Sequence, residues 1–257
     1  MEIKFQGTMA VIQDTHNPFQ DQRVLREVEL FLAELQPELL VKPGDLCDFY
    51  PLSKFDKNPN RADNLQSDLE STRRMNVRQR EILPNSRQIE IDGNHEDRLR
   101  RYLWSKAREL APLDALTVDK LYGLKENEIE HIEYEEGLLI NGNFMVTHGD
   151  LIRAHSAYTA KGMSDKHGGS GIHGHTHRGG NSLKRNRFGI YGWWENFCLC
   201  SLDPDWIQNP NWQQGFSLVH FKKDRFWVEQ MQIINKKFMY GGKVYGSGGK
   251  KRIEALP

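Results

Sequence analysis

Residues 87–96 read Arg-Gln-Ile-Glu-Ile-Asp-Gly-Asn-His-Glu, so a short run with strand-like spacing leads directly into Gly93-Asn94-His95-Glu96. The glycine ends the run, and an amide, an imidazole and a carboxyl group follow it. Open α/β sheets place their functional sites in loops at the carboxyl ends of their strands. This stretch therefore predicts a buried strand over 87–91 that carries functional side chains at its end.

Four further blocks on either side repeat this pattern of an apolar run followed by polar residues. They are Asp14-Thr15-His16, Gly44-Asp45-Leu46-Cys47-Asp48, Thr147-His148-Gly149 and Gly174-His175-Thr176-His177. A lone Asp-x-His is common by chance, but five blocks in this order are not. Their carboxylate, amide and imidazole groups suit two adjacent divalent cations, which can clamp the attacking and leaving oxygens of a displacement at phosphorus. We therefore expect a metal-dependent phosphoesterase.

The spacing of apolar residues predicts an α/β order around these blocks. A strand is expected over 9–13, a helix over 21–38 with apolar residues at helical spacing, and a strand over 39–42. This order favours parallel pairing with a right-handed crossover. Arginine-rich helices are expected over 62–83 and 97–110, and Asn141-Gly142 predicts a hairpin turn.

Composition narrows the class of protein. The 257 residues carry 35 basic and 35 acidic side chains, so a strongly basic field for nucleic acid is absent. No run approaches the roughly 20 apolar residues of a membrane span, and the three cysteines form no disulfide framework. We expect a cytoplasmic protein without membrane contact, with one domain over 1–240 and a flexible basic tail over 241–257.

The five blocks resemble the motifs of the calcineurin-like metallophosphoesterase superfamily, and the segment 193–216 resembles phage-encoded members. The resemblance implies a four-layer α/β/β/α sandwich of two mixed sheets flanked by helices. It implies one cation held by Asp14, His16, Asp45 and His177, and a second held by Asp45, Asn94, His148 and His175. It also implies that His95 acts on the leaving oxygen and that Asp48 orients it.

The ligand types leave the metal pair open. Mn²⁺ is the first expectation, and Zn²⁺, Fe and Mg²⁺ are alternatives, because oxygen and imidazole donors suit these ions to different degrees. Two cations that share one water lower its pKa, so hydroxide becomes available near neutral pH. Cys198-x-Cys200 could bind a soft metal, but alternate cysteines in a strand-like run are more typical of a packed core.

The substrate is less determined than the chemistry. The Ser/Thr phosphatases of the superfamily carry an arginine directly after the aspartate that corresponds to Asp48, whereas this chain has Phe49. The missing arginine counts against a phosphoprotein monoesterase, although Arg98 or Arg178 could substitute for it. The local basic patches and the phage resemblance favour a phosphodiesterase or nuclease acting on nucleic-acid or nucleotide diesters. The alternative is a phosphomonoesterase for a small metabolite or phosphoprotein, and a scaffold without catalysis is a third. The predicted substrate contacts are Arg98, Arg178, Lys184 and Arg185.

The partners expected are a phosphoester substrate, DNA or RNA among the candidates, and a second copy of the chain. Trp193, Trp194, Phe197, Trp206 and Trp212 crowd one segment with Asn and Pro residues. Stacking on bases is one interpretation. Packing of a loop on the sheet, or a homo-oligomer interface through Trp193–Phe216, is the favoured one.

Overall fold

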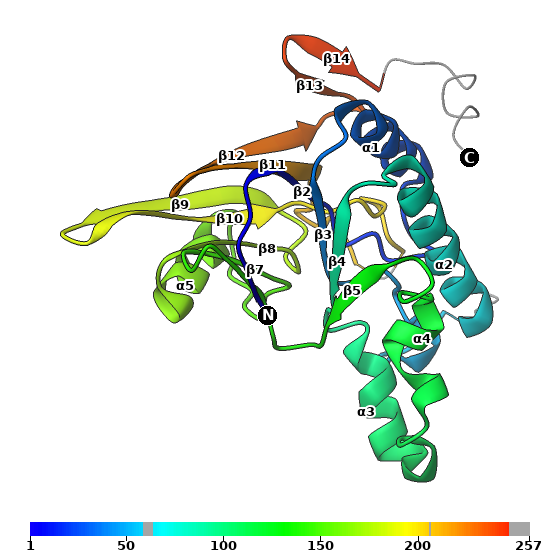
Figure 1. Cartoon of the computed structure of the whole chain (residues 1–257). Coiled ribbons are helices and arrows are strands. Elements are labelled where there is room, and N and C mark those ends of the chain that lie inside the picture. The colour runs from blue at the N-terminus through cyan, green and yellow to red at the C-terminus, as the bar shows by residue number, and fades with distance from the viewer. Residues whose placement is uncertain (59–63, 206, 247–257) are drawn as a thin grey trace.

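The computed structural model describes residues 1–58, 64–205 and 207–246, and within them two six-stranded sheets lie between helices (Figure 1). The helices are α1 (Gln22–Leu35), α2 (Leu65–Ile82), α3 (Asp97–Lys106), α4 (Val118–Tyr122) and α5 (Tyr158–His167). Three 3₁₀ turns cover Tyr50–Leu52, Arg108–Leu110 and Asp114–Leu116.

The first sheet has the strand order β12-β11-β2-β3-β4-β5. Its strands are β2 (Gly7–Val11), β3 (Leu39–Pro43), β4 (Arg87–Ile91), β5 (Ile129–Ile132), β11 (Gln214–Lys222) and β12 (Arg225–Ile233). Strands β2 to β5 pair in parallel, and β11 and β12 complete the sheet in antiparallel fashion. The expected strand–helix–strand unit with parallel pairing is therefore confirmed by β2, α1 and β3.

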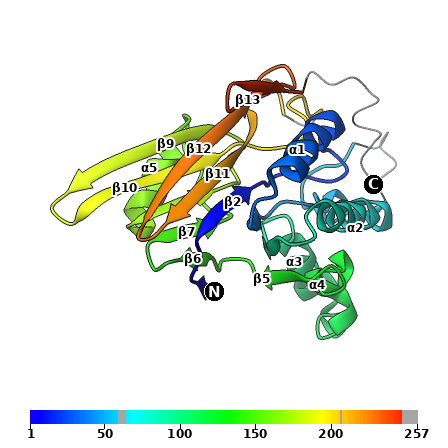
Figure 2. The same ribbon diagram turned by 45° about the horizontal axis from the view of Figure 1, so that its top comes forward.

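The second sheet has the order β1-β6-β7-β8-β10-β9. Its strands are β1 (Glu2–Ile3), β6 (Leu138–Ile140), β7 (Phe144–Thr147), β8 (Ser170–His173), β9 (Gly179–Asn186) and β10 (Gly189–Asn196). The hairpin of β6 and β7 turns at Asn141 and Gly142, both with positive φ, as the sequence predicts. Figure 2 shows β9 and β10 extending away from the rest of the molecule.

Side chains of alternate residues on the strands build two separate interiors, so the layers follow from the strand period. On β2, Met9 and Val11 pack between the two sheets, whereas Ala10 packs under α1 and α2. A third, smaller cluster joins α5 to the outer face of the second sheet through Trp193. The α/β/β/α sandwich of two mixed sheets flanked by helices is thus confirmed.

Two sequence expectations need correction. The expected loop over Trp193–Phe216 is shorter than the sequence predicts: Trp193 and Trp194 are part of β10, facing α5 and the other sheet respectively, and β11 begins at Gln214, so the described residues between 197 and 213 form the loop. The tail does not begin at 241: β13 (Phe238–Tyr240) pairs with β14 (Lys243–Tyr245), and Tyr245 is buried on α1 beside Phe31. The remainder of the expected tail, 247–257, and Trp206 lie outside the described residues.

Among the residues that the structure describes, no helix combines the length and apolar character needed to cross a membrane.

Candidate metal centre

The five polar blocks converge at one end of the sandwich, where strands of both sheets finish. Asp14 and His16 follow β2, Asp45 follows β3, and Asn94 follows β4 in the first sheet. In the second sheet, His148 directly follows β7, and the loop with His175 and His177 follows β8. The site is therefore built across the two sheets, at the carboxyl ends of their strands.

Backbone conformation at these loops is unusual and turns the side chains inward. Asp14, His16, Asp45, His175 and His177 all have φ between 49° and 70°, a left-handed region that costs free energy for residues other than glycine. Strain of this kind persists where the surrounding structure fixes it, which is typical of functional sites.

Two glycines permit the close approach of these loops. Gly44 has φ 89°, and a Cβ atom there would lie 2.6 Å from the backbone of Gly93. A Cβ atom on Gly93 would collide with the carboxylate of Asp45. Any larger residue at either position would push the loops after β3 and β4 apart.

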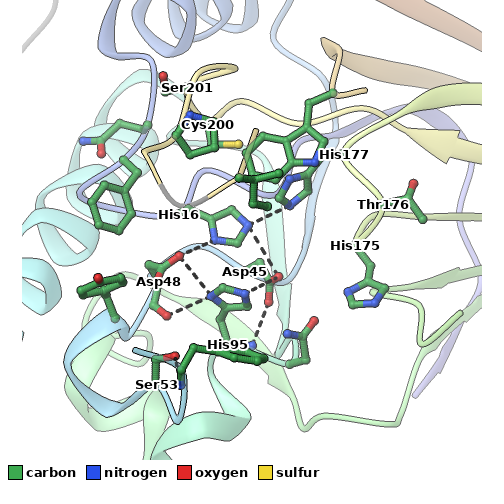
Figure 3. Close-up of a pocket in the computed structure, with 18 of the residues that line it drawn as sticks. His16, Asp45, Asp48, Ser53, His95, His175, Thr176, His177, Cys200 and Ser201 are labelled. Carbon is green, nitrogen blue, oxygen red and sulfur yellow. Dashed lines mark hydrogen bonds and ion pairs between the residues drawn. The ribbon is translucent and has the colours of Figure 1, made fainter. Parts of the chain in front are cut away.

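Asp14, His16, Asp45 and His177 form the first cluster, with one ligand atom of each within 4.8 Å of the others. The Nε2 atoms of His16 and His177 lie 2.9 Å apart. The Asp14 Oδ1 atom is 3.4 Å from His177 Nε2 and 3.8 Å from His16 Nε2. Donor atoms of three loops thus face one point, with His16 and His177 visible side by side in Figure 3.

Asp45, His148 and His175 form the second cluster, again within 4.8 Å. The Asn94 Oδ1 atom lies 2.9 Å from His148 Nε2 and adds an amide oxygen to this cluster. His148 donates its Nδ1–H to the carbonyl oxygen of Pro43 at 2.9 Å, because a carbonyl can only accept. The Nε2 atom of His148 consequently points into the site; burial lowers the pKa of the ring, but the charge of Asp45 raises it to about 9, so a bound cation would take the place of the Nε2 proton.

Asp45 belongs to both clusters. Its Oδ2 atom is 3.6 Å from His16 Nε2 and 3.4 Å from His148 Nε2. The His95 backbone N–H donates to Oδ1 of the same carboxylate at 2.9 Å, which fixes its orientation. A carboxylate in this position can bridge two cations, one in each cluster.

The carboxylates remain charged although they are buried. Asp14 is 0% and Asp45 is 1% exposed. Burial alone would raise their pKa values, but hydrogen bonds with His16 and His177 lower the pKa of Asp14 to about 2. His148 likewise holds the pKa of Asp45 well below its usual range. Two buried anions among imidazole lone pairs form a strong site for cations.

The donor set fits two divalent cations. Each cluster mixes carboxylate oxygen, which hard divalent ions favour, with imidazole nitrogen, which suits borderline divalent ions. All seven predicted ligands come together: Asp14, His16, Asp45, Asn94, His148, His175 and His177. They divide into two groups that share Asp45, in the partition that the resemblance implies.

His95 and Asp48 lie beside the first cluster, and Figure 3 shows the contacts that join them. The Asp48 Oδ2 atom accepts from His16 Nδ1 at 2.9 Å and lies 3.2 Å from His95 Nδ1. The His95 Nδ1–H also donates to the Asp48 backbone carbonyl at 2.9 Å. Asp48 therefore orients two imidazoles, the predicted ligand His16 as well as His95.

Arg98 completes this group. Its Nη1 atom donates to the Asp48 carbonyl at 2.8 Å and to Oδ1 at 3.0 Å, and its Nη2 atom donates to His95 Nε2 at 2.9 Å. Because guanidinium only donates, the His95 Nε2 atom accepts here and the ring is neutral in this arrangement. Asp48 and His95 thus hold Arg98 at the edge of the site.

Glu96 has a structural role that the sequence does not reveal. This buried carboxylate accepts from the backbone N–H groups of Asp45, Leu46, Cys47 and Gly93 at 2.8–3.2 Å, and from the Tyr122 hydroxyl at 2.9 Å. It therefore ties the loop after β3 to the loop after β4. Its position at the end of the Gly-Asn-His-Glu block was the available signal, but its backbone partners were not visible.

The structure separates the four predicted substrate contacts. Arg98 and Arg178 line a cavity of about 1150 Å³ whose lining also includes His16, Asp45, Asn94, His175 and His177 of the two clusters, whereas Lys184 and Arg185 do not line it. Arg178 donates from its two Nη atoms to the carbonyl oxygens of Ala154 and Arg153, which directs the guanidinium toward the backbone. Lys184 and Arg185 are exposed on β9, which runs away from the cavity. Only a substrate extending beyond the cavity could contact them.

A third cluster of His177, Cys198 and Cys200 lies behind the first. Burial raises the pKa of the Cys200 thiol well above its usual range, and the neighbouring Cys198 raises this pKa further. Because the thiolate is the form that binds metal, the protonated Cys200 thiol acts as a core residue, and Cys198 is buried beside it. The packed-core interpretation of Cys198 and Cys200 therefore fits their surroundings best.

Comparisons with known proteins give distant likenesses. No protein-family model matches the chain. The Gene 54 proteins of Mycobacterium phages D29 and L5 are each 26% identical over 255 residues, covering 92% of this chain and 98% of the phage protein.

Two solved structures are also similar, both at low TM-scores. Vps29 from Chaetomium thermophilum aligns at 10% identity and a TM-score of 0.46, over 88% of this chain and 86% of its own. A dimetal phosphatase from Danio rerio aligns at 12% identity and 0.40, over 87% and 95%. Likenesses at these levels assign no family.

Proposed function

We propose that this chain is a phosphodiesterase that hydrolyses nucleic-acid or nucleotide diesters with two divalent cations. One observation carries the proposal: Asp45 is shared between two clusters of oxygen and nitrogen donors at the carboxyl ends of the strands. The resemblance of the five blocks to the calcineurin-like superfamily supports it. The orientation of His95 by Asp48, beside the first cluster, supports it as well.

Bound divalent cations would supply a nucleophile from water near neutral pH and positive charge for the phosphoryl oxygens. The first would be held by Asp14, His16, Asp45 and His177, and the second by Asp45, Asn94, His148 and His175. We propose two Mn²⁺ ions as the metal pair, with Zn²⁺, Fe and Mg²⁺ as alternatives.

The protein's own residues would then act on the leaving group. A phosphate in the cavity competes with His95 for the guanidinium of Arg98, because an anion is the better acceptor. When Arg98 pairs with the phosphate, His95 Nε2 is free to hold a proton, while Asp48 keeps the ring oriented through Nδ1. Transfer of that proton to the departing oxygen yields an alcohol and a phosphomonoester.

A phosphomonoesterase is the second candidate, and Arg98 is the observation that favours it. Monoester dianions need cationic side chains around the phosphate. Among the described residues that line the cavity, Arg98 and Arg178 are the arginines, and no lysine lines it. Arg178 is 6% exposed and donates to two carbonyl oxygens, whereas the Arg98 side chain is 20% exposed beside the clusters, so one guanidinium can meet the substrate, which suits the single negative charge of a diester better.

The test compares two chromogenic esters on protein stripped of metal and reloaded with Mn²⁺. Bis-p-nitrophenyl phosphate reports diester hydrolysis and p-nitrophenyl phosphate reports monoester hydrolysis. We expect kcat/KM for the diester to exceed that for the monoester, and Asp45→Asn to abolish both activities.

The matched control is Asp114→Asn, which removes an exposed carboxylate far from the five blocks in sequence and should retain activity. Preference for the monoester would replace the proposal with the phosphatase alternative. Absence of both activities in protein that retains its metal would reject catalysis on these ester classes.

A further inference from the structure

The cavity extends from the metal clusters to a tryptophan that is held in place. The Trp212 ring lies edge-on against the His177 ring, with centroids 4.3 Å apart, and it lines the cavity half-buried. The Gln213 N–H donates to the His177 carbonyl oxygen at 2.8 Å, and the Gln213 side chain accepts from Gly179 N at 2.9 Å. Trp212 is therefore fixed to the loop that carries two predicted ligands.

Of the three other described aromatic residues that line the same cavity, Phe19, Tyr50 and Phe55, the first two lie closest in sequence to the site residues. Phe19 lies three residues after His16, and Tyr50 lies two residues after Asp48. Their rings meet edge to face with centroids 5.9 Å apart. Aromatic surfaces next to a phosphate site are the means by which proteins hold nucleobases, because every base presents a flat π face.

The cavity wall also carries polar groups that can accept or donate hydrogen bonds. Asp56, Asp203 and Asp205 line it, and Asp205 accepts from the Asn58 side chain at 3.1 Å. The Thr176 side chain lines it too; the residue is 6% exposed and its hydroxyl has no partner among the described residues. Carboxylates attract the N–H donors of a base edge and repel further phosphates.

Apart from Arg98 beside the clusters, the basic helices α2 and α3 contribute no side chain to the lining of this cavity. Arg78 of α2 donates to the buried carboxylate of Glu29, and Arg100 and Arg101 of α3 both pair with Asp97. Near the rim, Lys54 lies over the Phe55 ring and does not line the cavity. A chain with many phosphates would therefore meet little positive charge beyond the reacting position.

We propose that this cavity is a nucleoside subsite: it binds one aromatic base on Trp212, linked through the single reacting phosphate, and it disfavours longer polyanions. The inference rests on the proposed diesterase function and narrows its substrate to small nucleotide diesters. Trp212 and the carboxylates set specificity, while the metal clusters and His95 act at phosphorus.

The experiment measures kcat/KM of the Mn²⁺-loaded protein for esters that share the p-nitrophenyl leaving group. They are bis-p-nitrophenyl phosphate, thymidine 5′-p-nitrophenyl phosphate, the same thymidine ester with a second phosphate on its 3′ oxygen, and p-nitrophenylphosphorylcholine. We expect the thymidine ester to exceed bis-p-nitrophenyl phosphate about tenfold, within the contribution of one stacked base. The 3′-phosphorylated ester and the choline ester should both be poorer than the thymidine ester.

Variants assign this preference to the subsite. Trp212→Ala should reduce the ratio of thymidine ester to bis-p-nitrophenyl phosphate to near one, and Trp212→Phe should retain most of it. Trp227→Ala is the matched control, because Trp227 is 53% exposed on β12 outside the cavity, and it should leave the ratio unchanged. Asp203→Asn with Asp205→Asn should narrow the discrimination against the 3′-phosphorylated ester. Calorimetric titration with thymidine 5′-monophosphate gives a binding readout independent of turnover.

Each outcome decides a separate point. Hydrolysis of bis-p-nitrophenyl phosphate without a nucleoside preference overturns the subsite and leaves the diesterase intact. A preference that survives Trp212→Ala, or a better choline or 3′-phosphorylated ester, overturns it too. No hydrolysis of any ester overturns the diesterase, and loss of nucleotide binding in Trp212→Ala would then still support the subsite.

Discussion

Asp45 and His95 are adjacent in space, but substituting them should impair the protein in different ways. Asp45 lies between both clusters, whereas His95 contacts Asp48 and Arg98 and belongs to neither shared set. We expect His95→Ala to lower kcat by about 10²–10⁴, the usual contribution of a general acid, while bound metal stays near the wild-type content. Asp45→Asn should lose both. Elemental analysis beside kinetics checks this, and near-native turnover of His95→Ala would remove the role given to His95.

Glu96 acts through other residues, and its loss should weaken the metal centre indirectly. Four backbone N–H groups and the Tyr122 hydroxyl depend on its two oxygens. Glu96→Gln replaces one acceptor with an NH₂ group, so buried donors lose their partner at about 1–3 kcal/mol. We expect a lower free energy of unfolding and weaker Mn²⁺ affinity, measured by denaturant unfolding and by metal titration. The exposed Glu70→Gln is the control, and equal effects there would refute the assignment.

The sequence predicts where the strands end, but it does not predict which side chains contact backbone groups. An apolar run that stops at Asp14, Asp45 or Asn94 shows in the sequence itself, since strand burial and ligand chemistry each need particular side chains. Glu96 was missed because its partners are N–H groups that every residue has. Lys184 was placed near the site because it follows His177 closely. An extended strand moves about 3.3 Å per residue, so seven residues carry it well away.

Between β3 and β4 an ion pair lies where apolar residues would be expected. Lys42 and Glu90, both almost fully buried, are 3.1 Å apart, and Lys42 also donates to Asn76 of α2 at 2.5 Å. Burial raises the pKa of Glu90 and lowers that of Lys42, so each charge depends on the other. These residues fix α2 on the parallel strands that end in Asp45 and Asn94.

Breaking this pair should cost more than replacing it. Lys42→Met leaves a buried carboxyl without its cation, and we expect a loss of about 3 kcal/mol in the free energy of unfolding. Lys42→Met with Glu90→Leu should recover at least half of that loss, because two apolar side chains can pack together. Denaturant unfolding of the wild type, both single variants and the double variant completes the cycle. Additive losses would mean that the two residues act independently.

Strands β9 and β10 escaped sequence prediction for a physical reason. The segment 179–186 contains two glycines, two asparagines and a serine, and its side chains face solvent along the free edge of the sheet. An edge strand of this kind needs no alternation of apolar residues, so the pattern gives no strand signal. Its partner β10 carries the burial instead, through Trp193 and Trp194.

The candidate metal centre draws its residues from both sheets of the sandwich, so we expect stability to depend on metal. Asp14, His16, Asp45 and Asn94 extend from one sheet, and His148, His175 and His177 from the other. A cation bound only in the folded state at 100 times its Kd adds about 2.7 kcal/mol, which raises Tm by about 5–10 °C in a chain of this size. We therefore expect stripped protein to melt lower and to recover on Mn²⁺ addition, with faster hydrogen exchange at both sets of loops when metal is absent. Scanning calorimetry measures this shift in Tm. Asp114→Asn should show the same Mn²⁺-dependent shift as the wild type, and Asp45→Asn should show a much smaller one. An equal shift in Asp45→Asn would place the stabilising metal elsewhere.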